Sequence, residues 1–210
     1  MTREAYDSGR IKQAMHDGNR EFVSLIAYIS ALGWAGSPSL IYKGDSGDLQ
    51  DSWVESFDPS TQSAFFVASE NGWSSNAFGL RWLTQVFDPE TRERARGRRR
   101  LLIVDGHSLH INIGFLEACD TLRIVVLILP PHSTHRLQPL DVGLFLPLAL
   151  RYSQKLQKIL DNSHGMTRMT KRLFWEVFKE AWDLTFTEKN ITSAFKKTGI
   201  WPLDKRVVMK

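Results

Sequence analysis

Short apolar runs mark the strands that we expect in the first two thirds of the chain. Segment 22–32 is mostly apolar and ends at Gly33, a pattern typical of a buried strand followed by a turn. The run at 124–129 stops at Pro130 and Pro131, which interrupt regular structure. Runs of the same kind lie at 39–42, 64–67 and 101–104. The pattern therefore predicts several short strands, all of them before residue 130.

Helical spacing of apolar residues predicts a helix over about 75–95. Residues 113–121 also have a helical pattern, and they lie between the expected strands at 101–104 and 124–129. A strand, a helix and a second strand in this order form a βαβ unit. Such a unit implies that the two strands are parallel and that the crossover is right-handed.

The last third of the chain is predicted to be helical. Apolar residues share one face over 148–159 and again over 174–182, where the aromatic side chains are expected to be core. Thr187 is the expected N-cap of a further helix at 188–198, and Gly199 follows its end. With strands early and helices late, the predicted fold class is mixed α/β.

The composition is that of a folded globular domain. The chain has 210 residues, of which 42% are hydrophobic and 24% are charged, and a chain of this length can bury a core. The single cysteine, Cys119, excludes an internal disulfide and is predicted to be a small core residue. No apolar run approaches the roughly 18 residues that span a membrane, so no membrane partner is expected.

The net charge of +4 leans weakly toward an anionic partner such as DNA. Six arginines fall within residues 92–100. Four of them are candidates for contacts with the phosphates of DNA: Arg96, Arg98, Arg99 and Arg100. The same run could instead be a solvated helix end that leads into a strand, or a nuclear import signal. The sequence leaves these three interpretations open.

Two aspartates stand where an α/β protein would have a site. Asp105 directly follows the expected strand at 101–104, and Asp141 follows the strand at 124–129 after a stiff Pro-Pro turn. Ligands bind outside the carboxyl ends of the strands in open α/β sheets, and carboxylates are preferred ligands of Mg²⁺. The two aspartates could therefore share a divalent metal, and a loop-capping role for Asp105 is the alternative.

The segments that contain these aspartates resemble the catalytic blocks of a known family. Both DGHSLHINIGFLEACD and LPPHSTHRLQPLDVGLFLPL are similar to the C-terminal catalytic blocks of pogo, Tigger and jerky-type DDE transposases, which are relatives of the mariner group. Four further segments look like family blocks in the family's order: HDGNREFVSLIAYISALG, LIYKGDSGDLQDSWV, NGWSSNAFGLRWLTQVFD and AFKKTGIWPLD. The resemblance covers nearly the whole chain.

This resemblance implies an RNase H-like fold, in which three acidic residues hold two Mg²⁺ or Mn²⁺ ions for the cleavage and strand transfer of DNA. By motif, Asp105 is the second catalytic and metal-binding acid and Asp141 is the third. Leu109 departs from the family, which usually has Ser at that position. The side chains expected to line the site are His107, His110, His132, His135 and Gln138.

The first acid of the family lies on the first strand, in a block that would precede this sequence. We therefore expect an N-terminally truncated domain. Residues 1–165 would form the endonuclease domain without its first strand, and residues 166–210 a helical extension of the same domain. In the family the missing strand lies centrally, between the strands at 22–32 and 101–104, and these two would lose hydrogen-bond partners without it.

Loss of the first acid is expected to weaken metal binding. Two dications about 4 Å apart repel by roughly 16 kcal/mol at an effective dielectric constant of about 20. Carboxylates must offset this repulsion, and the missing carboxylate bridges both ions in the family. We therefore expect at most one weakly bound Mg²⁺ or Mn²⁺ ion, and little DNA cleavage.

Two functions of different class follow. The chain is either a metal-dependent endonuclease domain of a transposase with residual activity, or a catalytically dead relic that binds DNA or pairs with intact transposase copies. The resemblance and, more weakly, the arginine run favour the nucleus. A zinc site built from two histidine pairs is a weaker alternative. The sequence has no nucleotide-binding P-loop and no serine-hydrolase elbow.

Overall fold

The computed structural model describes residues 23–44, 47–70, 76–105, 112–163 and 169–207. The protein belongs to the mixed α/β class, as its sequence pattern predicts, with most strands early and the longer helices late. In these ranges, none of the helices combines the length and the apolar character that crossing a bilayer requires.

Three strands form one sheet, in the order β1 (Val23–Ile26), β2 (Ser39–Lys43) and β3 (Phe65–Ser69). The pairing of β1 with β2 is antiparallel, and that of β2 with β3 is parallel. Strand β1 is shorter than the predicted run because the chain turns back at Gly33. This residue has a φ of +89°, and its N–H donates to the carbonyl oxygen of Ser30 at 2.9 Å.

Two further strands, β4 (Arg100–Val104) and β5 (Ile124–Ile128), form a second sheet. They run parallel, as the βαβ pattern predicts, and α4 (Ile113–Thr121) lies between them in the chain. Within the part of the chain that the structure describes, no ladder joins this sheet to the first. Strands β1 and β4 therefore each have one paired neighbour there.

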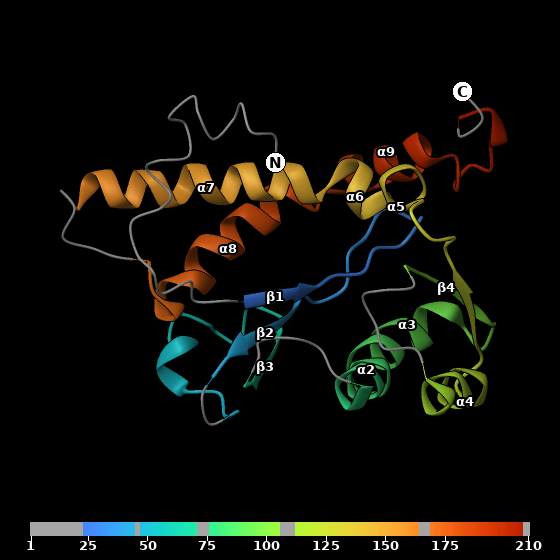
Figure 1. Ribbon diagram of the computed structural model, residues 1–210, viewed down its shortest axis with the longest axis horizontal. Helices are drawn as coiled ribbons and strands as arrows, with labels where there is room; N and C mark the ends of the chain where they lie inside the picture. Colours follow the sequence, from blue (N-terminus) through green and yellow to red (C-terminus); the bar gives the residue numbers. More distant parts are fainter. Residues whose placement is uncertain (1–22, 45–46, 71–75, 106–111, 164–168, 208–210) are drawn as a thin grey trace.

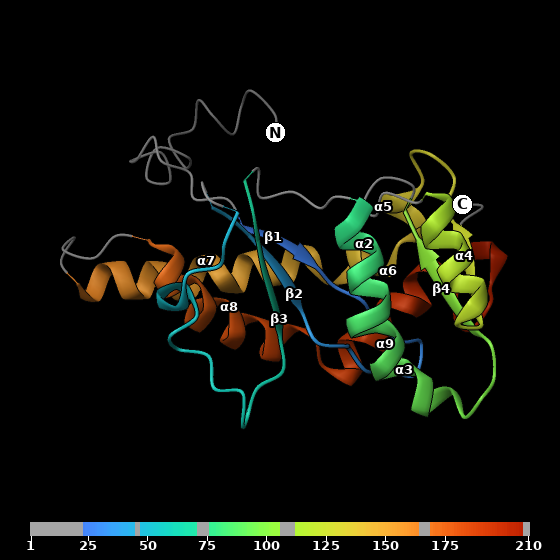
Figure 2. The ribbon, with the colours of Figure 1, turned by 90° about the horizontal axis from the view of Figure 1, so that it is seen from below.

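The helix predicted over 75–95 is present as a continuous helical segment. It consists of α2 (Asn76–Trp82), a π-helical turn η3 (Leu83–Phe87) and α3 (Asp88–Ala95). Leu83, Val86 and Phe87 are buried on its inner face, which is the face that the apolar spacing indicates. Figure 2 shows the segment as one rod that runs beside the first sheet.

The C-terminal part is helical, as predicted. Its helices are α7 (Phe145–Asn162), α8 (Lys171–Thr185) and α9 (Glu188–Thr198). The ends of α9 agree with the prediction: Thr187 Oγ1 accepts a hydrogen bond from the Asn190 N–H at 3.4 Å, and Gly199 adopts a left-handed φ of +67°. Short 3₁₀ turns lie at η2 (Asp51–Trp53) and η4 (Lys205–Val207).

Two short helices before α7 are not predicted by the apolar pattern. They are α5 (Thr134–Leu137) and α6 (Pro139–Gly143). Each is too short to complete a recognisable helical period, and the histidines and prolines of this segment favour a loop. These two helices matter for function because α6 carries Asp141.

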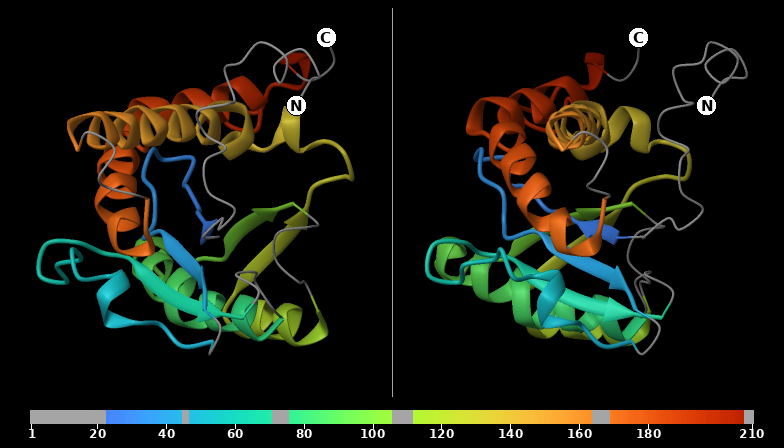
Figure 3. Two further views of the ribbon diagram at one scale, coloured as in Figure 1. Left: turned by 60° about the vertical axis from the view of Figure 1, so that its left-hand side comes forward. Right: turned by 90° about the vertical axis from the view of Figure 1, so that its left-hand side faces the viewer.

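The strands lie between two groups of helices. Helices α7, α8 and α9 cover one side, and α2, α3 and α4 cover the other (Figures 1 and 3). Cys119 is 1% exposed in the core beneath α4, as predicted. The aromatic stripe of α8 is also core, since Trp175 and Phe178 pack in one cluster with Leu40 and Tyr42 of β2.

The predicted domain boundary at residue 165 lies outside the described residues. Helix α8, which follows that boundary, packs on strand β2 through the cluster just described. The division into residues 1–165 and a helical extension at 166–210 remains a prediction.

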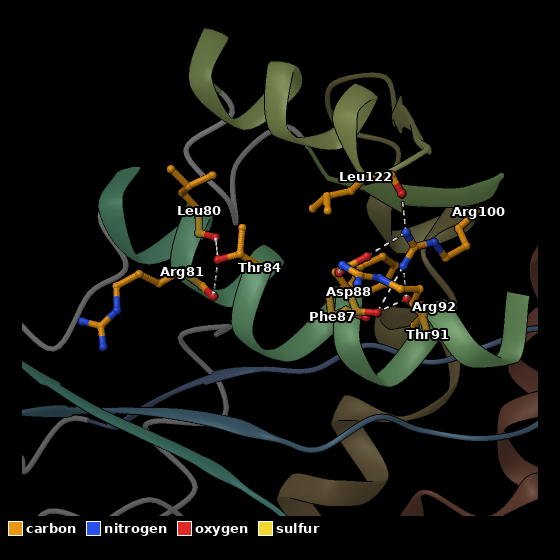
Figure 4. Close-up of polar contacts among 9 residues, drawn as sticks. All are labelled: Leu80, Arg81, Thr84, Phe87, Asp88, Thr91, Arg92, Arg100 and Leu122. Carbon is orange, nitrogen blue, oxygen red and sulfur yellow. Dashed lines mark hydrogen bonds and ion pairs between the residues drawn. The ribbon is translucent and has the colours of Figure 1, made fainter. Parts of the chain in front are cut away.

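A buried carboxylate ties β4 to α3. Asp88, the first residue of α3, is 1% exposed, and Nη2 of Arg100 lies 2.8 Å from its Oδ1 (Figure 4). Arg100 also donates from Nη1 to Thr91 Oγ1 at 2.8 Å and from Nη2 to the carbonyl oxygen of Leu122. Burial raises the pKa of Asp88, but hydrogen bonds from Arg92 and Arg100 outweigh this effect and hold the pKa below its usual value.

We expect the substitution Arg100→Ala to lower the free energy of unfolding by about 3 kcal/mol, because it removes the less exposed of the two arginine partners of a buried carboxylate. The matched control is Arg99→Ala. Arg99 is 66% exposed and lies 3.9 Å from the exposed Asp120, so its loss should cost less than about 0.5 kcal/mol. Urea denaturation of both variants measures the difference, and equal costs would contradict the structural role of Arg100.

The same ion pair gives a pH dependence. The pKa of Asp88 is lower in the folded than in the unfolded chain, so its contribution to stability is complete above about pH 4. That contribution is lost as the pH falls through the folded-state pKa. The difference in unfolding free energy between wild type and Asp88→Asn should therefore shrink between pH 6 and pH 3. A difference that stays constant over this range would count against the low pKa.

Candidate functional site

One cavity of about 1370 Å³ is lined by β1, an edge strand of the first sheet, and by β4 of the second sheet. Its middle is apolar, and helices from both layers contribute to it. Trp82 and Phe87 line it from the α2–α3 side, whereas Leu140 and Phe195 line it from α6 and α9. Charged side chains also line this cavity, and they come from segments at opposite ends of β4.

Asp105 and Asp141, the two predicted catalytic acids, both line this cavity. Asp105 directly follows the carboxyl end of β4, and it is partly buried. The parallel strand β5 ends at the same edge. From there the Pro130–Pro131 turn and the short helix α5 lead the chain to α6, whose first turn carries Asp141.

The two aspartates act on each other electrostatically. Asp141 is an exposed residue, but partial desolvation of its carboxyl group raises its pKa, as does the negative charge of Asp105, while a hydrogen bond from Thr134 lowers it. Like charges that share a site raise the free energy of the doubly ionised state. A cation between the two carboxylates would relieve this repulsion.

Gln138, which the sequence also predicts to line the site, adds a third oxygen-bearing side chain to the cavity. It precedes the first turn of α6, where Asp141 lies. Its Oε1 atom is buried and has no hydrogen-bond partner within the described ranges. Two carboxylates and an orphaned amide oxygen suit a hard divalent cation such as Mg²⁺ or Mn²⁺, so the residues present fit the metal that the resemblance implies.

The structure describes two of the four histidines that were predicted to line the site. His107 and His110 lie outside the described residues. His132 and His135 are exposed, and neither is among the residues that line the cavity. In the described ranges, no three His, Cys, Asp or Glu side chains come close enough to hold a metal ion together. The site-lining role of the four histidines remains a prediction.

The four arginines predicted to bind DNA, Arg96, Arg98, Arg99 and Arg100, all line the same cavity. They lie at or before the start of β4, whereas Asp105 follows its end. Arg100 is 10% exposed in its side chain and is held by Asp88, which gives it a structural role. The other three are the more accessible to a ligand, since Arg96, Arg98 and Arg99 are exposed.

Two further residues of the site are not among the predicted site residues. Arg94 lines the cavity with its guanidinium 4.3 Å from the ring centre of Trp34. Thr134 reaches Asp141 across two short helices. Arg94 belongs to the arginine run of residues 92–100, which could have pointed to it. No sequence pattern links Thr134 to Asp141, because α5 and α6 are too short to show a helical period.

Comparison with known proteins identifies the family. Residues 20–195 match the family described as DDE superfamily endonuclease. The chain is also 39% identical over 201 residues to a protein named MFS-type transporter clz9 from Cochliobolus lunatus. That match covers 96% of this chain but 21% of the relative, so the chain spans about a fifth of the length of this relative. No solved structure matches the chain. Because the family match covers most of its length, the chain belongs to the DDE superfamily endonucleases.

Proposed function

We propose that this chain is a catalytic domain of a pogo-type DDE transposase whose described residues supply two acids to the site, and that it binds DNA but cleaves it weakly. Membership of the DDE endonucleases indicates transposase-like cleavage of nucleic acid with a divalent metal. The observation that carries the proposal is that one cavity is lined by Asp105, by Asp141 and by the arginines that precede β4.

The residues of the site have separable tasks. Asp105 and Asp141 would hold a Mg²⁺ or Mn²⁺ ion, and such an ion when bound activates water and neutralises charge on the phosphate. Thr134 orients the Asp141 carboxylate through its hydrogen bond. Arg96, Arg98 and Arg99 would hold the DNA backbone, because phosphate contacts from arginine position a duplex without reading its sequence.

One further strand could join the two sheets. Strands β1 and β4 line the same cavity, and neither has a second ladder partner among the described residues. One extended segment between them could pair with both. Its side chains would meet apolar groups on both faces, such as Trp82 on one and Phe195 on the other, which is the environment of a central strand.

The alternative function is a catalytically dead relic that binds DNA or pairs with intact transposase copies. The placement of the arginines favours it, because they lie at the other end of β4 from Asp105. A strand of five residues is about 17 Å long, so DNA could bind at the arginines without an active metal site. For either function we propose that the protein acts in the nucleus. Although one relative is named a transporter, we propose no transport activity for this chain, because the family that it matches is one of endonucleases.

We expect the double substitution Arg98→Ala and Arg99→Ala to flatten the salt dependence of binding to duplex DNA. Each lost phosphate contact removes about 0.9 from the slope of log K against log salt concentration, so the slope should fall by about 2. Fluorescence anisotropy with a labelled duplex in EDTA measures this slope without cleavage. The control is Arg151→Ala, an exposed residue of α7 outside the cavity, and an equal slope in both variants would remove the arginines from the interface.

Weak cleavage can be tested with a supercoiled plasmid and Mn²⁺. We expect the wild-type chain to nick the plasmid barely faster than Asp105→Asn, because one weakly bound metal ion is a poor catalyst for this reaction. Rapid nicking by the wild type that disappears in Asp105→Asn would show that Asp105 is catalytic and that the proposed impairment is wrong. Rapid nicking that persists in Asp105→Asn would point to a contaminating nuclease or to a different site.

A further inference from the structure

The backbone N–H and carbonyl oxygen of Gln138 are both hydrogen-bonded. Its N–H donates to the carbonyl oxygen of Thr134 at 2.9 Å, and its own carbonyl oxygen accepts from the N–H of Val142 at 3.0 Å. The side-chain oxygen is different: Oε1 is buried and has no hydrogen-bond partner in the described part of the chain. A buried carbonyl oxygen of this kind is unfavourable unless a ligand, water or ion satisfies it.

Gln138 lines the same cavity as the two acids of the site. Gln138 is the N-cap of α6 and Asp141 lies in its first turn, so the two residues are close in the chain at the start of this helix. Both line the cavity that Asp105 also lines. The three side chains thus offer oxygens from two elements of the fold, the end of β4 and the start of α6.

We infer that Gln138 Oε1 is a third protein ligand of the divalent metal, so that the site holds a single Mg²⁺ or Mn²⁺ ion through two carboxylates and one neutral amide oxygen. The inference rests on the proposed function, in which Asp105 and Asp141 bind the metal. Asn and Gln carbonyl oxygens are ordinary ligands of hard cations, and water completes the shell.

A neutral ligand agrees with the expected limit of one ion. The carboxylates of Asp105 and Asp141 together offset the charge of one dication, and an amide oxygen adds a ligand without adding charge. A second dication close to the first would then meet repulsion that no further carboxylate among these three side chains offsets. Gln138 therefore stabilises the first ion without making a two-metal site.

Isothermal titration with Mn²⁺ on the full chain tests the inference. We expect Gln138→Leu to weaken Mn²⁺ binding at least about tenfold, and Gln138→Glu to tighten it, because the added carboxylate supplies charge as well as an oxygen. The control is Gln154→Leu, an exposed glutamine of α7 that lies outside the cavity, and its affinity should equal that of the wild type.

Thermal unfolding without metal separates a ligand from a structural residue. Gln138→Leu removes an unsatisfied polar atom, so its melting temperature in EDTA should not fall, while the increase that Mn²⁺ gives the wild type should be lost. A lower melting temperature in EDTA with an unchanged Mn²⁺ increase would assign Gln138 to packing and overturn the inference. The Gln138→Glu variant gives an independent test if Gln138→Leu does not fold.

Asp105→Asn distinguishes failure of this inference from failure of the proposed function. If Asp105→Asn loses Mn²⁺ binding and Gln138→Leu keeps it, the metal site stands and Gln138 is not a ligand. If the wild type binds no Mn²⁺, or if Asp105→Asn binds it as tightly as the wild type, the proposed metal site is wrong and the inference falls with it.

Discussion

The ion pair between Asp88 and Arg100 fixes strand β4 to helix α3, and the candidate site depends on where β4 lies. Arg100 begins this strand, and Asp105 follows its end. The parallel ladder with β5 then determines where the chain leaves toward α6 and Asp141. A buried carboxylate with paired arginines is costly to rearrange, so it holds the scaffold on which both acids are placed. Although Arg100 lines the cavity, it contributes to the site by holding β4 in place through Asp88.

The fold could be predicted from the sequence wherever one periodic pattern covers a whole element. The helix at 113–121, the parallel pair at 101–104 and 124–129, and the capped helix at 188–198 all agree with the structure to within a residue or so. Strand β1 ends earlier than its apolar run, because the turn at Gly33 competes with the propensity of the segment. The placement of Asp105 and Asp141 on one cavity also follows from the pattern, since both come after parallel strands.

What the sequence could not give depends on contacts between distant or aperiodic residues. Helices α5 and α6 are too short to carry a period, so the reach of Thr134 to Asp141 is visible only in three dimensions. The arginine run contains two kinds of residue that look alike in sequence: Arg100 is turned inward by Asp88, and Arg98 is exposed. The unsatisfied oxygen of Gln138 is a property of its surroundings and has no sequence signature.

The division of the strands into two sheets has a consequence for the behaviour of the polypeptide in solution. Within the described ranges, β1 and β4 each have one ladder partner, and both line a cavity with a mainly apolar lining. Edges of this kind recruit strands from other molecules. At high concentration the domain should therefore self-associate where these strand edges are open, and its solubility should depend on how well they are covered. Covering these strand edges therefore matters for keeping the domain in solution.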